Sequence, residues 1–392
     1  MSAAPVATGP DGPPRPRGRR PRTRRSRRTW LVVRLLVMAG LAYVGVLVVA
    51  SNSAELSGAA TYLRRANWGW IAAAVLAEAL SYGAFTQLQR VLLASGGLRT
   101  RVAPMVGVTL AGNAINTTIP GGGAFATIFA YRQFRRRGAD EALTTWTLVA
   151  IGALAAVALA GLAVVGLLVA GEDGPVGGLW PLVALLVAGP VLAVAVLMRP
   201  GILRRLALPP ARWLGSWLQR PGGVLRRVGL LTGPGVDPDV LIGGLVERLE
   251  AVKPGARSWS AGLGFALGNW VADCGCLVLA HQAVGAAVPW RGLLVAYGAA
   301  QVAANLPITP GGLGVVEGSL TVALVAYGGS TAGSVAAVLV YRIISFWALL
   351  PIGWLAFLGL QLEARRHPLV ESGIVAAAER GTGADAGPED IS

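Results

Sequence analysis

The sequence has little of what a soluble enzyme uses for its surface or its chemistry. Of its 392 residues only 14% are charged, two are cysteine, two are histidine, and Lys253 is the sole lysine. Soluble domains carry about 25% charged residues, so an ordinary soluble protein is excluded. His281 and His367 lie far apart, and side chains two apart on a helix, such as Cys274 and Cys276, do not face each other. The sequence therefore predicts no metal site, cofactor or disulfide framework.

Apolar sequence, in contrast, is abundant and gathered in blocks. Hydrophobic residues make up 54% of the chain, and a helix of ~20 apolar residues spans a bilayer. Six continuous blocks reach that length, at about 31–50, 69–88, 142–170, 178–198, 259–282 and 334–360. The sequence therefore predicts an all-α polytopic membrane protein with about six full transmembrane helices.

Two further apolar segments, at about 103–134 and 292–327, are each interrupted in the middle. The interruptions are Pro120-Gly121-Gly122-Gly123 and Pro310-Gly311-Gly312-Leu313-Gly314, and the halves on either side are too short to cross comfortably. Arginines flank both ends of the first segment, which the positive-inside rule places in the cytoplasm. The same rule places both ends of the second segment outside. We expect two re-entrant hairpins that enter the membrane from opposite faces.

The two hairpins also resemble each other in sequence. A shift of 190 residues pairs Pro120 with Pro310 and Gly138 with Gly328, together with the glycines that follow each proline. Matching units of opposite orientation are typical of the inverted-topology repeats of secondary transporters. The pattern predicts such an inverted repeat.

The two ends and the central connector are polar. Residues 1–29 hold nine arginines against Asp11 alone, which predicts a disordered cytoplasmic tail that contacts anionic headgroups rather than nucleic acid. A twin-arginine export signal at Arg27-Arg28 is an alternative, disfavoured because a membrane bundle follows it. We expect an amphipathic cytoplasmic connector at 199–258, a disordered tail at 363–392, and both termini in the cytoplasm.

The hairpin breaks are the first candidate site. Irregular backbone inside a membrane is tolerated only where it is buried in protein or lines a wet cavity. A half-helix that begins after glycines presents free N–H groups and a positive dipole end, which suit a lipid phosphate. The alternative is that the breaks only let helices pack closely. The candidate substrate- or lipid-binding residues are Asn113, Asn116, Thr117, Thr118, Pro120, Gly121, Gly122, Gly123, Asn305, Thr309, Pro310, Gly311, Gly312, Gly314, Glu317 and Arg342.

Ionisable residues inside the spans form a second set of candidates, because their burial in a membrane is costly. Glu78 lies nine residues into its span, about 14 Å deep, and Asp273 falls in the outer half of another span. Both are candidates for ion coupling. A pair of Arg342 with Glu317 or with Asp273 is geometrically possible, and a purely structural pair is the alternative to a role in binding or gating.

The motifs resemble those of a known family, the transmembrane region of lysylphosphatidylglycerol synthases and its stand-alone flippase-like relatives. The resemblance covers about residues 30–362. It is carried by the segment from Asn305 to Gly318, by Tyr341-Arg342, and by Ile119 to Gly123 with Tyr131-Arg132 and Arg137-Gly138. In that family the membrane region is associated with moving aminoacylated phosphatidylglycerol between leaflets, while a separate domain makes that lipid. The resemblance implies a translocator without aminoacyl-transferase activity.

These patterns favour a flippase-like transporter, not an enzyme, that moves a phospholipid or a lipid-linked anionic headgroup between leaflets. The sequence has no GxxxxGK[ST] phosphate loop, so ATP-driven transport within the chain is not expected. A membrane-embedded enzyme acting on a lipid phosphate or polyprenyl carrier and an accessory recruitment protein are the alternatives. The Arg-rich, nearly Lys-free composition, with much alanine and glycine, is typical of a GC-rich bacterial genome. It therefore favours a bacterial plasma membrane. The lipid, the transport direction, the coupling ion and the oligomeric state stay open.

Overall fold

The structure is a computed structural model, and the residues that it describes lie in one compact unit, Ala54–Ser392. They are 61–119, 121–171, 180–199, 254–304 and 309–366, together with the single residues 205, 209, 243 and 252. The predictions for the 1–29 tail, for the 31–50 span, and for most of the 199–258 connector and the 363–392 tail lie outside them.

The elements in this part of the chain are all helices. Four of them are long and apolar enough to cross a membrane, namely Trp68–Ser95, Glu141–Ala170, Ala256–Val284 and the continuous stretch Thr331–Glu363. The predicted all-α membrane protein is confirmed at this level. The count of six crossings stays a prediction, because the 31–50 block is not described and the 178–198 block forms a 19-residue helix that contains Pro190.

The long helices follow the predicted apolar blocks closely. They are α3 (Trp68–Ser95), α6 (Glu141–Ala170), α7 (Trp180–Met198) and α11 (Ala256–Val284). The last block begins with α14 (Thr331–Arg342), continues through a π-helical segment, η3 (Ile343–Ala348), and ends with α15 (Leu349–Arg366). Capping side chains fix two of the starts, since Asn67 accepts from the Gly69 amide at 2.8 Å and Asp140 from the Leu143 amide at 2.7 Å.

Both interrupted segments are pairs of short helices joined at the Pro-Gly clusters. The first pair is α4 (Val102–Thr118) and α5 (Gly122–Arg136), and the second is α12 (Trp290–Ala304) and α13 (Val315–Ala326) with the short 3-10 turn η2 (Pro310–Gly312) between them. At 1.5 Å per residue, each of these four helices is about 18–26 Å long, short of a bilayer core of ~30 Å. Their re-entrant path through the membrane stays a prediction.

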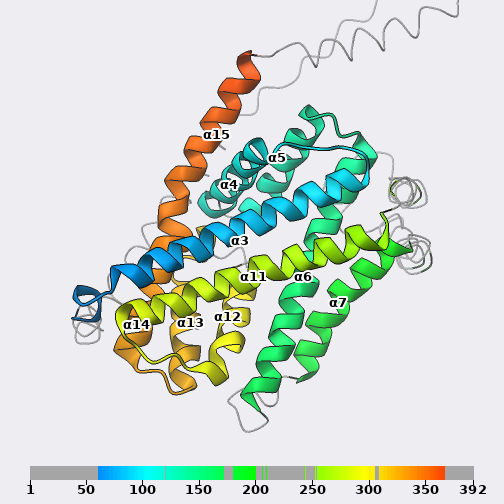
Figure 1. Ribbon diagram of the computed structural model, residues 1–392. Coiled ribbons are helices and arrows are strands. Elements are labelled where there is room, and N and C mark those ends of the chain that lie inside the picture. The colour runs from blue at the N-terminus through cyan, green and yellow to red at the C-terminus, as the bar shows by residue number, and fades with distance from the viewer. Residues whose placement is uncertain are drawn as a thin grey trace, which may run out of the picture. The chain divides into compact units, whose positions relative to one another are not determined.

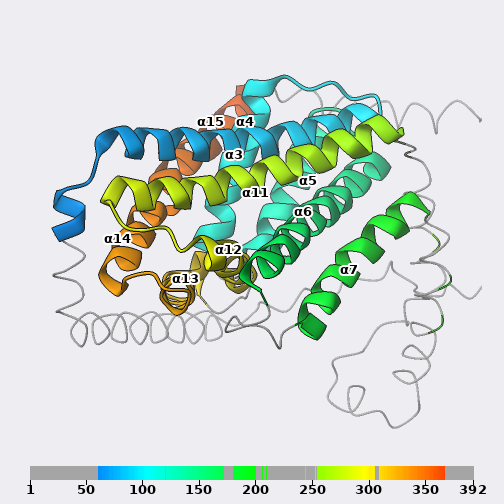
Figure 2. The same ribbon diagram turned by 60° about the horizontal axis from the view of Figure 1, so that its bottom comes forward.

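Helices α3 and α11 lie side by side and run in opposite directions (Figures 1 and 2). The Asn67 amide before α3 donates to the Ala283 carbonyl near the end of α11 at 2.7 Å. At the other end, Gly262 of α11 packs against Leu88 and Leu92 of α3. Segments nearly two hundred residues apart in sequence therefore form the central pair of the bundle.

Starting from α3 and from α11, the helices occur in the same order in the two halves of the chain. The order is a long helix, a helix pair broken by Pro-Gly, and another long helix, with equivalent elements about 190 residues apart. The packing is also reciprocal. Helix α15 of the second half packs on α4 of the first, and α6 of the first half packs on α12 of the second.

Glycines allow these reciprocal contacts to be close. Gly353 of α15 sits on the backbone of Leu110 in α4, and Gly166 of α6 sits on Leu294 in α12. Small residues that let helix backbones approach are the usual packing device in membranes, where lipid is as apolar as a leucine side chain.

Replacing Gly353 by valine is expected to lower stability more than the same change at Gly359 of the same helix. A side chain at Gly353 would overlap the Leu110 carbonyl oxygen and the Ala114 methyl group, whereas one at Gly359 meets nothing within 4 Å. Overpacking costs about 1–3 kcal/mol. The temperature at which half of the detergent-purified protein loses monodispersity measures the difference, and equal losses for the two variants would contradict the close contact of α15 with α4.

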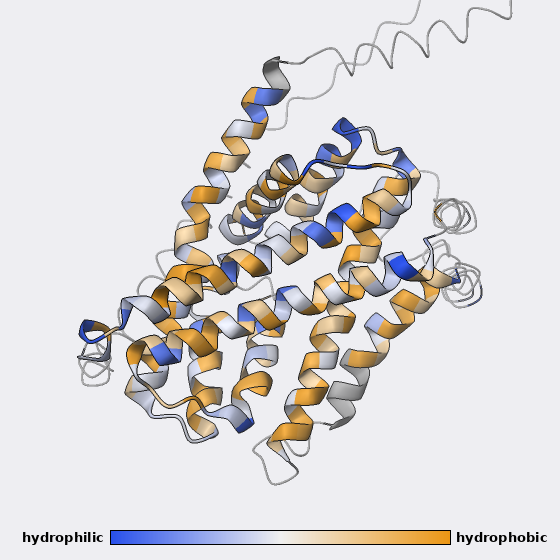
Figure 3. Ribbon diagram, in the orientation of Figure 1, coloured by the Kyte–Doolittle hydropathy of each residue, from blue (hydrophilic) through white to orange (hydrophobic). Residues whose placement is uncertain are grey.

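The surface of the bundle is apolar in a way that suits lipid. Large hydrophobic side chains such as Leu168, Val322 and Leu355 are about two-thirds exposed, and most of the ribbon in α6, α7 and α15 is hydrophobic (Figure 3). Buried polar residues, in contrast, include Glu78 and Asp273, which lie inside the bundle. The bundle thus exposes large apolar side chains and holds acidic side chains in its interior.

Candidate functional site

A cavity of about 560 Å³ lies between the helices, and both halves of the chain line it. Its walls come from α3, α4, α5 and α6 of the first half, and from α11, α12, η2, α14 and η3 of the second. Many of its lining residues are polar or charged: Glu78, Ser81, Tyr82, Gln89, Thr109, Asn113, Asn116, Thr117, Thr127, Asn269, Asp273, Gln301, Tyr341, Arg342 and Ser345. A cavity with many polar side chains in its wall therefore lies within a bundle that exposes large apolar side chains.

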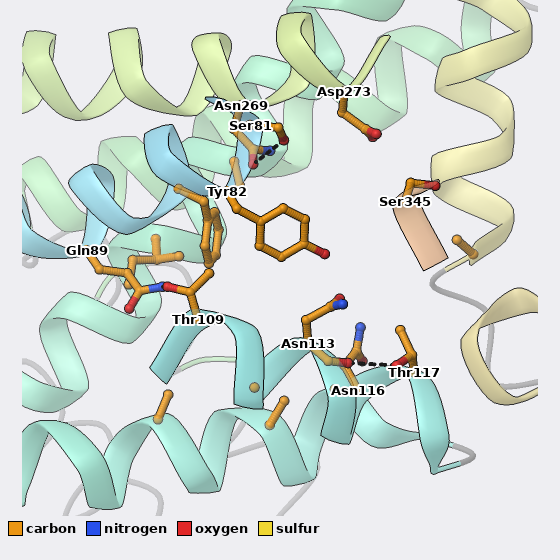
Figure 4. Close-up of a pocket in the computed structure, with 18 of the residues that line it drawn as sticks. Ser81, Tyr82, Gln89, Thr109, Asn113, Asn116, Thr117, Asn269, Asp273 and Ser345 are labelled. Carbon is orange, nitrogen blue, oxygen red and sulfur yellow. Dashed lines mark hydrogen bonds between the residues drawn. The ribbon is translucent and has the colours of Figure 1, made fainter. Parts of the chain in front are cut away.

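Helical periodicity directs these side chains inward. On α3 the lining residues Glu78, Tyr82 and Gln89 follow a spacing of four and seven residues, which keeps them on one helix face. The spacing of Asn269 and Asp273 on α11 has the same effect. Figure 4 shows Asp273 and Asn113 on opposite sides of the cavity, with the Tyr82 ring reaching into the space between them.

The two Pro-Gly breaks meet beside this cavity. Gly311 of η2 has φ +59°, and a side chain there would lie 3.0 Å from the carbonyl oxygen of Thr117 at the end of α4. It would also overlap the ring of Phe346 in η3. The first break turns through Gly121, which has φ +68° and precedes α5. Glycine adopts this left-handed conformation without steric cost, and so both breaks depend on it.

Asp273 is the acceptor at the centre of a hydrogen-bond cluster. Its Oδ2 accepts from the Tyr297 hydroxyl at 2.5 Å and from the Gln301 side-chain amide at 2.8 Å. The Tyr341 hydroxyl donates to its Oδ1 at 3.0 Å. Three donors from α12 and α14 thus surround this α11 carboxylate, which is 9% exposed. This is an environment that stabilises a negative charge.

Glu78 lies opposite, on α3, and is poorer in partners. Its side chain lines the cavity, is 4% exposed, and lies beside Asp273 and Cys276 of α11. Among the described residues its Oε2 atom has no hydrogen-bond partner. Two acidic side chains from the central helix pair therefore share one polar interior.

Arg342 and Glu317 form the predicted ion pair, and the pair holds the second break. Arg342 Nε donates to Glu317 Oε1 at 2.7 Å, and a terminal guanidinium nitrogen donates to the Gly311 carbonyl at 3.2 Å. Glu317 Oε2 accepts from the Gly314 amide at 2.7 Å, and the Arg342 guanidinium lies over the Phe346 ring. The pair therefore ties both sides of the break to α14.

The structure brings half of the described sequence candidates to the cavity. Those that line it are Glu78, Asn113, Asn116, Thr117, Gly123, Asp273, Gly311 and Arg342. The described candidates that are not among its lining residues are Thr118, Gly121, Gly122, Thr309, Pro310, Gly312, Gly314 and Glu317. These either belong to the turns of the breaks or brace them, as Glu317 does. Pro120 and Asn305 lie outside the described residues.

Sequence reasoning missed several lining residues, above all Tyr82, Gln89 and Thr109 near the α3–α4 contact and Asn269 on α11. Gln89 donates to Thr109 at 3.0 Å, so these two also tie the helices together. A signal was available for the α3 residues, since they share the helix face of Glu78.

The long apolar helices, the buried acidic side chains between them and the close glycine-mediated packing define an integral membrane protein. Residues 31–353 match the family described as the lysylphosphatidylglycerol synthase TM region, and the chain belongs to this family. The family inferred from the motifs is thus confirmed.

A relative from the archaeon Methanothermobacter thermautotrophicus, described as a UPF0104 membrane protein, is 34% identical over 178 residues. The match covers 45% of this chain and 49% of the relative. The chain thus spans about half the length of the curated relative that it matches.

Proposed function

We propose that the protein is a flippase-like transporter that moves a phospholipid or a lipid-linked anionic headgroup between the leaflets of a bacterial plasma membrane, with both termini in the cytoplasm. The observation that carries the proposal is the cavity that both halves of the chain line with many polar side chains. A headgroup in hydrocarbon loses its hydrogen bonds to water, at a cost of several kcal/mol per polar group. A cavity that offers replacement partners lowers that barrier.

The size and chemistry of the cavity support this proposal. Its volume of about 560 Å³ falls within the range of small-molecule sites. Asn113, Asn116 and Thr117 offer polar side chains beside the first break, and Gly123 brings the start of α5 to the wall. A helix start of this kind favours a phosphate. The acyl chains would stay in the surrounding lipid.

The repeated helix order supports a way of alternating access. We propose that the two halves form an inverted repeat and that one half rocks against the other around the cavity, as in many secondary transporters. The reciprocal contacts of α15 with α4 and of α6 with α12 are the interfaces that would slide. Energy would come from a lipid gradient, a coupled ion or the membrane potential.

Filling the cavity should block exchange. Gly152 of α6 lines the cavity, and a Cβ atom added there would meet nothing within 4 Å, so tryptophan would occupy the cavity rather than disturb the packing. Gly161 of the same helix is equally open but is not among the lining residues. In liposomes that hold fluorescent phosphatidylglycerol or phosphatidylethanolamine, we expect Gly152→Trp to slow leaflet exchange by about tenfold or more and Gly161→Trp to match the wild type.

Leaflet exchange is read by quenching the outer leaflet, with empty liposomes as the background. Equal rates for the two tryptophan variants would contradict a role for the cavity. No exchange by the wild type with any headgroup would overturn the proposal. Conversion of a lipid phosphate to a new product in detergent, where leaflets do not exist, would instead support the enzyme alternative. Loss of exchange after deletion of residues 1–29 would point to recruitment through the arginine-rich tail.

A further inference from the structure

We propose that Glu78 and Asp273 form a proton-binding site that couples lipid translocation to proton movement, with Glu78 as the carboxyl that takes up and releases the proton. This inference rests on the proposed lipid transport. It assigns the coupling ion and gives the two carboxyls different roles.

The first argument is the unequal supply of donors. Asp273 accepts three hydrogen bonds, from Tyr297, Gln301 and Tyr341. Glu78 is equally buried and lines the cavity, yet its Oε2 has no partner among the described residues. A buried carboxylate oxygen without donors is costly. A proton on Glu78 removes that cost and leaves the single negative charge on Asp273, where the donors are.

The second argument is the set of charges around Glu78. Tyr82 on its own helix, Asp273 and Cys276 on α11, and Tyr341 on α14 are the titratable groups that face it. All of these are neutral or acidic. Two carboxylates that share one site repel each other, so the pair favours holding one proton between them.

Arg342 is the nearby cation, and it is already engaged. It pairs with Glu317 at 2.7 Å and reaches Asp273 only through space. The Glu78 side of the pair therefore has no counter-ion among the described residues. A proton, rather than an arginine, would therefore neutralise the Glu78 carboxylate.

A proton fits this site better than a metal cation does. Hard cations such as Ca²⁺ bind several oxygens whose lone pairs are free. The Asp273 oxygens, in contrast, already accept from two hydroxyl groups and an amide N–H. Within the part of the chain that the structure describes, no group of three or more His, Cys, Asp or Glu side chains is placed to hold a metal ion.

The coupling step needs no other chemistry. A proton from water on one side of the membrane binds Oε2 of Glu78, the halves rock, and the proton leaves to water on the other side. With the proton bound, the central helix pair carries one buried charge. Without it, the pair carries two, and the transition becomes more costly because the second charge lies on a buried carboxylate whose Oε2 has no partner among the described residues. Exchange should therefore slow as pH rises through the range in which the site loses its proton.

The test uses the full-length protein in liposomes with equal pH inside and outside. We expect the wild-type exchange rate to fall by up to about tenfold per pH unit over the titration range. Glu78→Gln, which mimics the protonated form, should give a flat profile. The control Glu363→Gln makes the same chemical change on α15 outside the cavity and should keep the wild-type profile.

Infrared spectra of the detergent-purified proteins give a second readout that does not depend on transport. The carbonyl band of a protonated carboxyl should be present in the wild type and missing in Glu78→Gln. Wild-type exchange that does not change with pH would overturn the coupling but leave lipid transport intact, as would a Glu78→Gln profile that still falls with pH. Absence of exchange at every pH, with the infrared band present, would instead remove the transport function.

Discussion

Replacing Gly311 with alanine is expected to destabilise the protein by about 2–5 kcal/mol and to abolish lipid exchange. Gly311 has φ +59°, a conformation that costs an alanine about 1–2 kcal/mol. The new methyl group would also overlap the Phe346 ring and lie 3.0 Å from the Thr117 carbonyl oxygen. Both the turn of the second break and its contact with α4 would have to shift.

Gly121 provides a matched control for this prediction. Its φ of +68° is similar, but a methyl group there meets nothing within 4 Å. Gly121→Ala should therefore cost only the left-handed strain, about 1–2 kcal/mol. Thermal loss of monodispersity and leaflet exchange are measured on both variants. Equal damage in the two would mean that the meeting of the breaks contributes nothing beyond backbone strain.

A second substitution, at Phe346, tests whether the cost of Gly311→Ala comes from contact with the Phe346 ring. In a Phe346→Ala background the ring that Gly311 touches is gone, so the further loss caused by Gly311→Ala should shrink. Non-additivity of this kind is expected of residues in contact. Full additivity would place the two residues in independent roles.

Apolar length and Pro-Gly clusters were sufficient to predict the helices. The block predicted at 142–170 is the helix Glu141–Ala170, and the break predicted at Pro310 is where η2 begins. Both signals are local, since a helix needs a run of apolar residues and a break needs a residue that cannot continue the helix. The element order could therefore be predicted from the sequence.

The cavity could not be predicted in the same way, because it depends on how distant helices pack. Glu78 and Asp273 become neighbours only because α3 and α11 run antiparallel along each other. The donors to Asp273 come from two further helices, through Tyr297 and Tyr341. Nothing local marks these tyrosines as partners of an acidic residue in another helix.

The Glu317–Arg342 pair shows how much can be predicted from the depth of residues in the membrane, counted along their helices. Depths along the helices allowed Arg342 to pair with Glu317 or with Asp273, and the structure selects Glu317 at 2.7 Å. Depth along a helix says nothing about backbone partners. The bonds to the Gly311 carbonyl and from the Gly314 amide, which turn the pair into a brace for the break, required the structure.

Replacing Arg342 with alanine is the second change from which we expect a large effect. The Arg342 side chain is 9% exposed and that of Glu317 is 25% exposed, so the substitution leaves a mostly buried carboxylate without its cation. It also leaves the Gly311 carbonyl without this donor. Breaking a buried pair by removing one partner costs about 3–5 kcal/mol. We expect a loss of stability near the lower end of that range and a fall in exchange of at least about tenfold.

Replacing Arg342 with lysine instead of alanine separates the effect of the positive charge from that of the guanidinium geometry. Arg342→Lys keeps the positive charge, but a lysine ammonium is a point charge and cannot reproduce the fork that reaches Glu317 and Gly311 together. If the fork holds the break, lysine should recover only part of the stability and little of the exchange. In the Glu317→Gln background, Arg342→Ala should cost less than in the wild type, because no charged carboxylate is then left unpaired. If Arg342→Ala exchanges lipid at the wild-type rate when equal amounts of both proteins are inserted, the ion pair has no role in transport. If Arg342→Ala loses exchange but keeps full stability, Arg342 binds the lipid headgroup rather than holding the break in place.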